Sequence, residues 1–152
     1  MYRRSSFKLL FVIGTAMVIA IIVMLVLFFS PSHQAKNAVD KFYSLEQEWD
    51  FSSSWNMLHP QMKERFTRGH YIQDRSHVFM NHFGVDTFSY SLSRAKKINN
   101  WRKMEESEPL TVYKVTVTKK YKGKYGNFRM IQDVFAAKED NKWKILWDYK
   151  GQ

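Results

Sequence analysis

The order of apolar and polar positions divides the chain into three parts. Residues 9–29 form an apolar run without a charged side chain. Over residues 35–82 apolar positions recur at intervals of three and four, a spacing typical of amphipathic helices. From residue 86 onward apolar and polar residues mostly alternate, which predicts β-strands with one buried face. We therefore expect one apolar helix, then a helical segment, then a β-rich segment.

The apolar run is long enough to cross a bilayer. A helix rises about 1.5 Å per residue, so residues 9–29 would span about 30 Å, the thickness of the hydrocarbon core. The apolar core of a cleaved signal peptide is shorter and ends in a small-residue cleavage site. Here the apolar run ends with the large residue Phe29, and Ser30 and Pro31 follow it. The run is predicted to be a retained single-pass transmembrane helix, with signal cleavage as the minor alternative.

Basic residues predict the orientation of this helix. Arg3, Arg4 and Lys8 precede it without an accompanying acid. Positive charge near a membrane helix favours the cytoplasmic side, so the C-terminal part is expected outside the cell membrane. The predicted divisions are a cytoplasmic basic tail (1–8), a transmembrane helix (9–29), a linker (30–34) and an extracytoplasmic domain (35–152).

The domain is predicted to begin with three helical segments. Residues 35–49 place Ala35, Val39, Phe42 and Trp49 on one face of a helix. A second helix follows the serines before Trp55, and Pro60 interrupts it because the residue before a proline avoids helical angles. The third segment, residues 70–82, ends before a glycine at position 84, a common helix terminator.

Period-two patterns predict the strands. They cover residues 86–93, 113–121, 128–137 and 143–149, with turns at 122–127 and 139–141. The segment 128–137 has a mixed phase, as expected of a central strand that is covered on both faces. Helices followed by an antiparallel meander of three or four strands indicate an α+β domain.

Composition narrows the chemistry. The chain has no Cys, which excludes disulfides, thiolate metal sites and a Cys nucleophile. Aromatic residues make up 16% of the chain, which is typical of a folded domain rather than a disordered one. The net charge of +10 favours contact with anionic partners.

Four stretches carry a resemblance to a known family. They are the aromatic-faced first helix ending at Trp49, the turn Trp55-Asn56-Met57-Leu58-His59-Pro60, the helix opening at Tyr71, and the strands closing on Asn141-Lys142-Trp143-Lys144-Ile145-Leu146-Trp147. Together they resemble the NTF2-like (cystatin-like cone) superfamily. The resemblance implies about three helices packed on a curved antiparallel sheet. Similar cone domains follow a single membrane helix in bacterial VirB8-like conjugation components and occur in some penicillin-binding transpeptidases. The superfamily includes enzymes as well as non-enzymatic modules.

Candidate catalytic residues are few. Asp74 and His77 lie one turn apart on the third helix and could serve as an acid–base pair in a cone pocket, as could Asp133 if it pointed inward. The alternative for the first two is a solvated helix face. No nucleophile motif, phosphate-binding glycine loop or metal-ligand spacing is present, so no enzyme activity, cofactor or metal is expected.

Two further sets of residues are candidates for binding. Aromatic side chains expected in the core, or lining a pocket if the cone is not filled, are Trp49, Trp55, Tyr71, Trp143 and Trp147. Basic residues interleaved with aromatics around the second hairpin predict a basic surface that either binds a polyanion or simply forms the solvated face of the sheet. They are Lys114, Lys119, Lys120, Lys122, Lys124 and Arg129.

These observations favour a non-enzymatic interaction or assembly module, anchored by one helix at the outer face of a bacterial membrane. Its expected partners are the lipid bilayer and other envelope proteins. The resemblance adds a homodimer formed through the sheet face, and nucleic acid is not expected. The alternatives are a tethered small-molecule binder or enzyme that uses the cone pocket, and a polyanion-binding domain.

Overall fold

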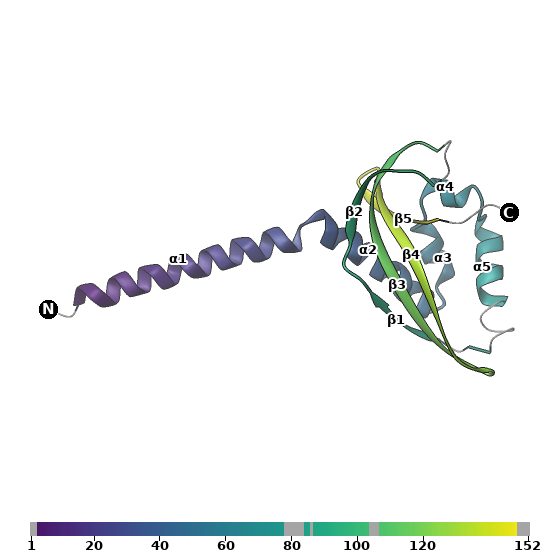
Figure 1. Cartoon of the computed structure of the whole chain (residues 1–152), viewed down its shortest axis with the longest axis horizontal. Coiled ribbons are helices and arrows are strands. Elements are labelled where there is room, and N and C mark those ends of the chain that lie inside the picture. The colour runs from purple at the N-terminus through teal and green to yellow at the C-terminus, as the bar shows by residue number, and fades with distance from the viewer. Residues whose placement is uncertain (1–2, 78–83, 86, 104–106, 149–152) are drawn as a thin grey trace.

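The computed structural model describes residues 3–77, 84, 85, 87–103 and 107–148 of the chain. It shows an α+β domain with a curved antiparallel sheet, from which an apolar N-terminal helix projects (Figure 1). The sheet curves around one helix, and the remaining helices lie on the side of the domain away from the projecting helix (Figure 1). The predicted α+β class is confirmed.

The projecting helix, α1 (Arg3–Phe28), is long and apolar enough from Lys8 to Phe28 to cross a membrane. The next helix, α2 (Pro31–Gln47), starts almost immediately. The Ser30 hydroxyl accepts the His33 backbone N–H at 3.3 Å, and Pro31 occupies the first helical position, where its missing N–H is not needed. Residues 31–34 of the predicted linker therefore form the first turn of α2, with Ser30 as its cap.

Helix α2 carries the predicted apolar face. Ala35, Val39, Phe42 and Tyr43 are buried along it. Three short helices follow: α3 (Phe51–Asn56), α4 (Pro60–Lys63) and α5 (Arg68–Ser76). The third predicted helical segment begins slightly earlier than expected, and its part over residues 78–82 lies outside the described residues.

Five strands form the sheet. They are β1 (Phe88–Leu92), β2 (Lys96–Trp101), β3 (Leu110–Gly123), β4 (Gly126–Glu139) and β5 (Lys142–Trp147). The strand order is β1-β3-β4-β5. β1 and β2 both pair with the edge of β3 that faces away from β4, β1 along its C-terminal half and β2 along its N-terminal half. Sequence periodicity missed β2 because its exposed lysines and asparagines do not alternate with apolar residues.

Two-residue turns close the long hairpins. Asp140 and Asn141 both have positive φ, 47° and 59°, as a type I′ turn between β4 and β5 requires. The β3–β4 pairing keeps one register from Val112 opposite Ala137 to Gly123 opposite Gly126. The consecutive residues Val134 to Ala137 are all buried, which confirms β4 as a central strand over that length.

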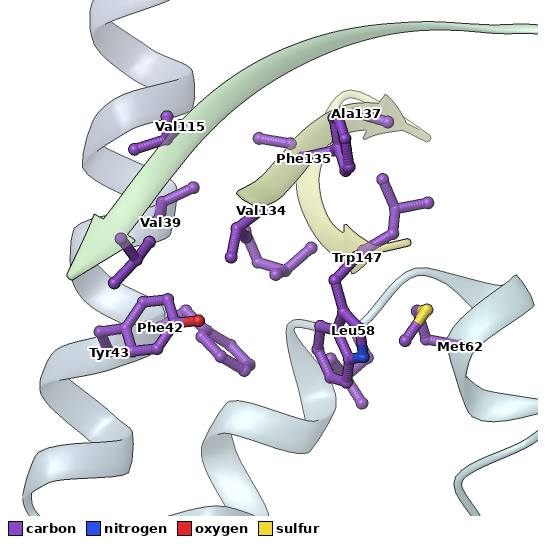
Figure 2. Close-up of a cluster of buried hydrophobic side chains, with 14 of the residues drawn as sticks. Val39, Phe42, Tyr43, Leu58, Met62, Val115, Val134, Phe135, Ala137 and Trp147 are labelled. Atoms are coloured by element: carbon purple, nitrogen blue, oxygen red, sulfur yellow. The ribbon is translucent and has the colours of Figure 1, made fainter. Parts of the chain in front are cut away.

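The core lies between α2 and the concave face of the sheet (Figure 2). Val39 and Phe42 of α2 face Val115 of β3 and Val134 of β4, and Trp147 packs against the Phe42 ring with centroids 6.3 Å apart. The turn before α4 is tied to the sheet as well, because the His59 N–H donates to the Ile145 carbonyl at 2.9 Å.

We predict that Ile145→Ala lowers the free energy of unfolding by about 2–5 kcal/mol, because it leaves a cavity in this core. Ile145 is 0% exposed. Ile131→Ala is the matched control: that residue is 60% exposed, and its substitution should change stability by less than about 0.5 kcal/mol. Urea unfolding followed by Trp fluorescence measures both, and equal losses would contradict this account of the core.

Candidate functional site

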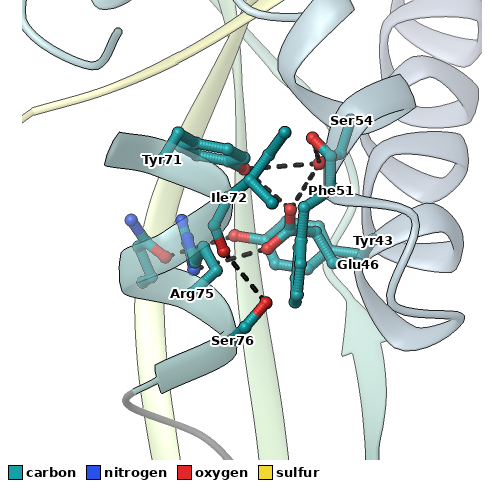
Figure 3. Close-up of polar contacts among 9 residues, drawn as sticks. Tyr43, Glu46, Phe51, Ser54, Tyr71, Ile72, Arg75 and Ser76 are labelled. Carbon is teal, nitrogen blue, oxygen red and sulfur yellow. Dashed lines mark hydrogen bonds and ion pairs between the residues drawn. The ribbon is translucent and has the colours of Figure 1, made fainter. Parts of the chain in front are cut away.

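A buried carboxylate lies at the centre of the polar side chains inside the domain. Glu46 of α2 is only 4% exposed. Its Oε1 accepts hydrogen bonds from the Ser54 hydroxyl at 2.5 Å and the Tyr71 hydroxyl at 2.7 Å (Figure 3). Its Oε2 lies 3.4 Å from a guanidinium nitrogen of Arg75. A buried carboxylate needs such partners, because an isolated one would be neutralised by protonation.

Local structure places these partners together. Asp50 caps α3 by accepting the Ser53 N–H at 3.0 Å, and the adjacent Ser54 faces α2. Tyr71 and Arg75 are four residues apart on α5, so they project from the same helix face. Figure 3 shows both side chains of α5 directed at Glu46.

The sheet contributes a second cation, and this one is buried. Lys119 of β3 is 2% exposed, and its ammonium lies 5.5 Å from the Tyr43 ring centroid and 5.9 Å from that of Tyr121. Burial lowers the pKa of Lys119 to about 8, with repulsion from Arg75 adding to the effect and Glu46 opposing it.

Burial also controls the other titratable groups of the cluster. It raises the pKa values of Tyr43, Tyr71 and Tyr121, so these phenols stay neutral well into the alkaline range. Burial opposes the charge on Arg75, but Glu46 and the surrounding tyrosines hold its pKa above the ordinary value. The cluster therefore holds one carboxylate and two cations, with neutral hydroxyls around them.

The interior has little free space. A cavity of about 10 Å³ lies at the cluster, which is room for about one water molecule. The residues around it are Glu46, Trp49, Phe51, Arg75, Phe88, Lys119 and Tyr121. An organic substrate would not fit there unless side chains moved. Within the described ranges no three His, Asp or Glu residues are grouped to hold a metal ion.

The acidic and histidine candidates from the sequence lie outside this interior. Asp74 and His77 are exposed on α5, and Asp74 borders a shallow depression of about 210 Å³ beside Trp147. Asp133 is on the outer face of the sheet, where it binds Lys114 Nζ at 2.7 Å and Thr116 Oγ1 at 2.6 Å. These hydrogen bonds lower its pKa. None of these three residues is among the described residues that line the small interior cavity, whereas Asp74 lines the depression on α5.

The aromatic candidates are distributed over several places. Trp49 lines the small cavity, Tyr71 binds Glu46, and Trp147 is in the core. Trp55 donates its indole N–H to the Phe66 carbonyl at 2.7 Å, and Trp143 donates to Gln34 Oε1 at 3.2 Å. Both are partly buried supports of the fold.

The predicted basic surface needs one correction. Lys120, Lys122, Lys124 and Arg129 are exposed on the β3–β4 hairpin, and Lys114 is held by Asp133, but Lys119 is buried. Lys119 is two positions from both Val117 and Tyr121, so its side chain points with theirs to the concave face. An open groove of about 770 Å³ runs along this end of the sheet. Among the described residues it is lined by Gln47, Thr87, Phe88, Ser89, Lys120, Tyr121, Lys122, Asn127, Phe128 and Arg129.

Sequence reasoning missed the buried cluster itself. Its signals in the sequence were two polar residues at positions where the periodicity leads one to expect an apolar residue. Glu46 follows Phe42 by four positions on α2, and Lys119 is two positions from each of two inward-pointing residues of β3. Neither position reveals its partner, because Arg75 lies on a different helix.

Comparison of the chain with protein-family models and with curated proteins finds no match. The function must therefore be argued from the geometry described above.

We predict that Glu46→Ala lowers the free energy of unfolding by about 3–5 kcal/mol, since Arg75 and Lys119 would lose their counter-charge. Glu48→Ala, on the exposed side of the same region, should change it by less than about 0.5 kcal/mol. Chemical unfolding of the full chain in detergent measures the difference. Similar values for the two variants would show that the ion pair is not structurally important.

We also predict that stability rises between pH 8 and 9.5. Lys119 releases its proton near pH 8 in the folded state but near 10.5 in the unfolded chain, so the unfolded chain binds more protons in this range. The expected gain is about 1–2 kcal/mol, and it reverses at higher pH, where the tyrosines ionise on unfolding. Urea titrations at each pH measure it. Lys119→Met should abolish the rise, whereas the exposed control Lys120→Met should retain it.

Proposed function

We propose that this chain is a non-enzymatic interaction module, anchored by α1 and placed at the outer face of a bacterial membrane as part of an envelope complex. The observation that carries the proposal is the filled interior: the cavity at the polar cluster holds about 10 Å³, and the carboxylate of Glu46 is already paired with Arg75. Because this cavity has no room for a substrate, we expect the domain to act through contacts between its surface and partner molecules.

The fold assigned in this proposal is an NTF2-like cone with a membrane anchor. In its support, the curved sheet encloses α2, the short helices stand at one end, and α1 leads into α2 through Phe29 and Ser30 alone. This close connection keeps the domain next to the bilayer. A homodimer formed through the sheet face remains part of the proposal.

A polyanion-binding domain is the second candidate. The observation that favours it is the cluster of exposed cations on the β3–β4 hairpin, Lys120, Lys122, Lys124 and Arg129. Such binding would weaken steeply as salt increases, because it releases counterions. The pocket-based enzyme or binder has less support, since its polar candidates lie outside the interior cavity.

The proposal predicts where single cysteines can be labelled, and the natural chain has none to interfere. In intact cells a membrane-impermeant maleimide should label Ser91→Cys on β1 and Gln73→Cys on α5, both of which are exposed positions. Ser5→Cys in the N-terminal tail should react only after permeabilisation. The reverse pattern would contradict the orientation.

The same cysteines test the interaction. If the maleimide carries a photoreactive group, illumination should join Ser91→Cys or Gln73→Cys to a discrete envelope protein, identified by mass spectrometry. Both variants yielding only the labelled monomer would contradict the function as an interaction module.

A further inference from the structure

Over residues 126–133, one edge of strand β4 has no pairing partner among the described residues, and it is called the open edge below. β5 pairs with it only from Val134 to Glu139 and ends at Trp147. In the described part of the chain, residues 126–133 of β4 pair with β3 alone.

The backbone groups on this edge point outward in a regular order. In an antiparallel pair, residues alternate between those bonded to the neighbouring strand and those turned away from it. The two-residue turn after Gly123 makes Gly126 a bonded partner, so the even-numbered residues of β4 face β3. The Ser93 N–H donates to the Thr116 carbonyl at 3.0 Å, which shows that Thr116 turns away from β4 and hence that Asp133 turns away from β3. Asn127, Arg129, Ile131 and Asp133 therefore present N–H and C=O groups to the open edge.

Other edges of the sheet are protected. The free side of β5 is covered where Met57 and His59 exchange backbone hydrogen bonds with Ile145 at 2.9 Å. β2 is short, lysine-rich and irregular in register. β1 has five residues, and Gln47 Nε2 donates to its Phe88 carbonyl at 2.6 Å. Natural proteins shield edges in such ways because a bare edge pairs with other strands.

The open edge of β4 is regular and partly apolar. Ile131 is 60% exposed and Met130 is 40% exposed, and they lie on opposite faces of the strand. No proline or bulge interrupts its pairing with β3. An added strand would therefore find both hydrogen-bonding groups and apolar contacts.

The charge near the open edge indicates which kind of partner strand would bind there. From position 110 to position 138 the only acidic residue of the sequence is Asp133, which is paired with Lys114. Lys120, Lys122, Lys124 and Arg129 are exposed near the edge. A second copy that used the same edge would bring like charges together. An acidic segment would instead meet complementary charge.

We propose that the β4 edge over residues 127–133 binds an extended acidic segment of a partner protein, which joins the sheet as an additional strand. The inference rests on the proposed function as an interaction module and names its surface and partner chemistry. An edge of this length spans about 23 Å and accommodates about seven residues. If acidic and apolar side chains alternate in that strand, the acidic ones would lie on the face of Arg129 and Ile131, and the apolar ones on the opposite face beside Met130.

The test uses the full chain in detergent and a fluorescent eight-residue peptide in which valine alternates with glutamate. Fluorescence anisotropy should show saturable binding. Methylating alternate backbone nitrogens of the peptide should weaken binding at least about tenfold, because edge hydrogen bonds are lost. If the methylated peptide binds equally well, the surface is a general polyanion site and the inference is overturned.

Hydrogen exchange locates the peptide without altering the protein. The amides of Arg129 and Ile131 should exchange fast in the free chain and become protected by the peptide, whereas the Phe128 and Met130 amides already bond to β3. If the Arg129 and Ile131 amides are protected before the peptide is added, the edge is already occupied. Protection that depends on protein concentration would mean that a second copy occupies it, and protection that does not would mean that the chain itself does. Either result overturns the inference.

Variants separate the backbone from the charge contribution. Ile131→Pro removes an edge N–H without removing a bond to β3, and should weaken binding about five- to tenfold. Ile131→Ala keeps the N–H and should weaken binding less. Arg129→Gln should also weaken binding, whereas Lys97→Gln on β2, an equal loss of charge elsewhere, should not. Equal effects of the last two variants would overturn the role of this edge.

These outcomes are distinct from failure of the proposed function. If photocrosslinking from Ser91→Cys or Gln73→Cys captures an envelope protein but the peptide does not bind, the chain is an interaction module that uses another surface. If neither is observed, both proposals fail.

Discussion

The contact between Glu46 and Arg75 is the interaction on which the arrangement of the helices depends. Through its two oxygens, the Glu46 carboxylate joins α2 to α3 by way of Ser54 and to α5 by way of Tyr71 and Arg75. Of these helices, α3 and α5 are short and would not be stable alone. A buried charge in low dielectric strongly favours the one geometry that satisfies it, so this carboxylate determines where α3 and α5 stand relative to the sheet.

The same contact limits what the interior can do. Every strongly polar group placed there is already engaged: Ser54 and Tyr71 with Glu46, and Lys119 with the aromatic rings around it. Groups engaged in this way cannot bind a substrate without first losing those contacts. The polar cluster therefore stabilises the fold, and the exposed hairpin, with its groove and open edge, is the more accessible place for binding.

Local patterns predicted the elements that rely on local rules. The apolar face of α2, the alternation in β3 from Val115 to Tyr121 and the turns between strands follow from residue spacing, and the structure contains them. In β5 the predicted alternation is not present, because the consecutive residues Ile145 to Trp147 are all buried. β2 was missed because an exposed edge strand carries no such alternation. The orientation of Asp133 depends on register, and the meeting of Glu46, Arg75 and Lys119 depends on packing between distant segments. Neither can be read from a local window of sequence.

The position of the open edge agrees with a role in reaching partners beyond the membrane surface. α1 leaves the domain on one side, and the turn joining β3 to β4 lies at the opposite end of the sheet (Figure 1). In the proposed anchored state the domain would have little freedom to turn its distal hairpin toward the lipid, because α2 follows α1 after Phe29 and Ser30 only. The exposed lysines of that hairpin would then be directed away from the bilayer. A partner that supplies an acidic strand would meet them there rather than at the headgroups.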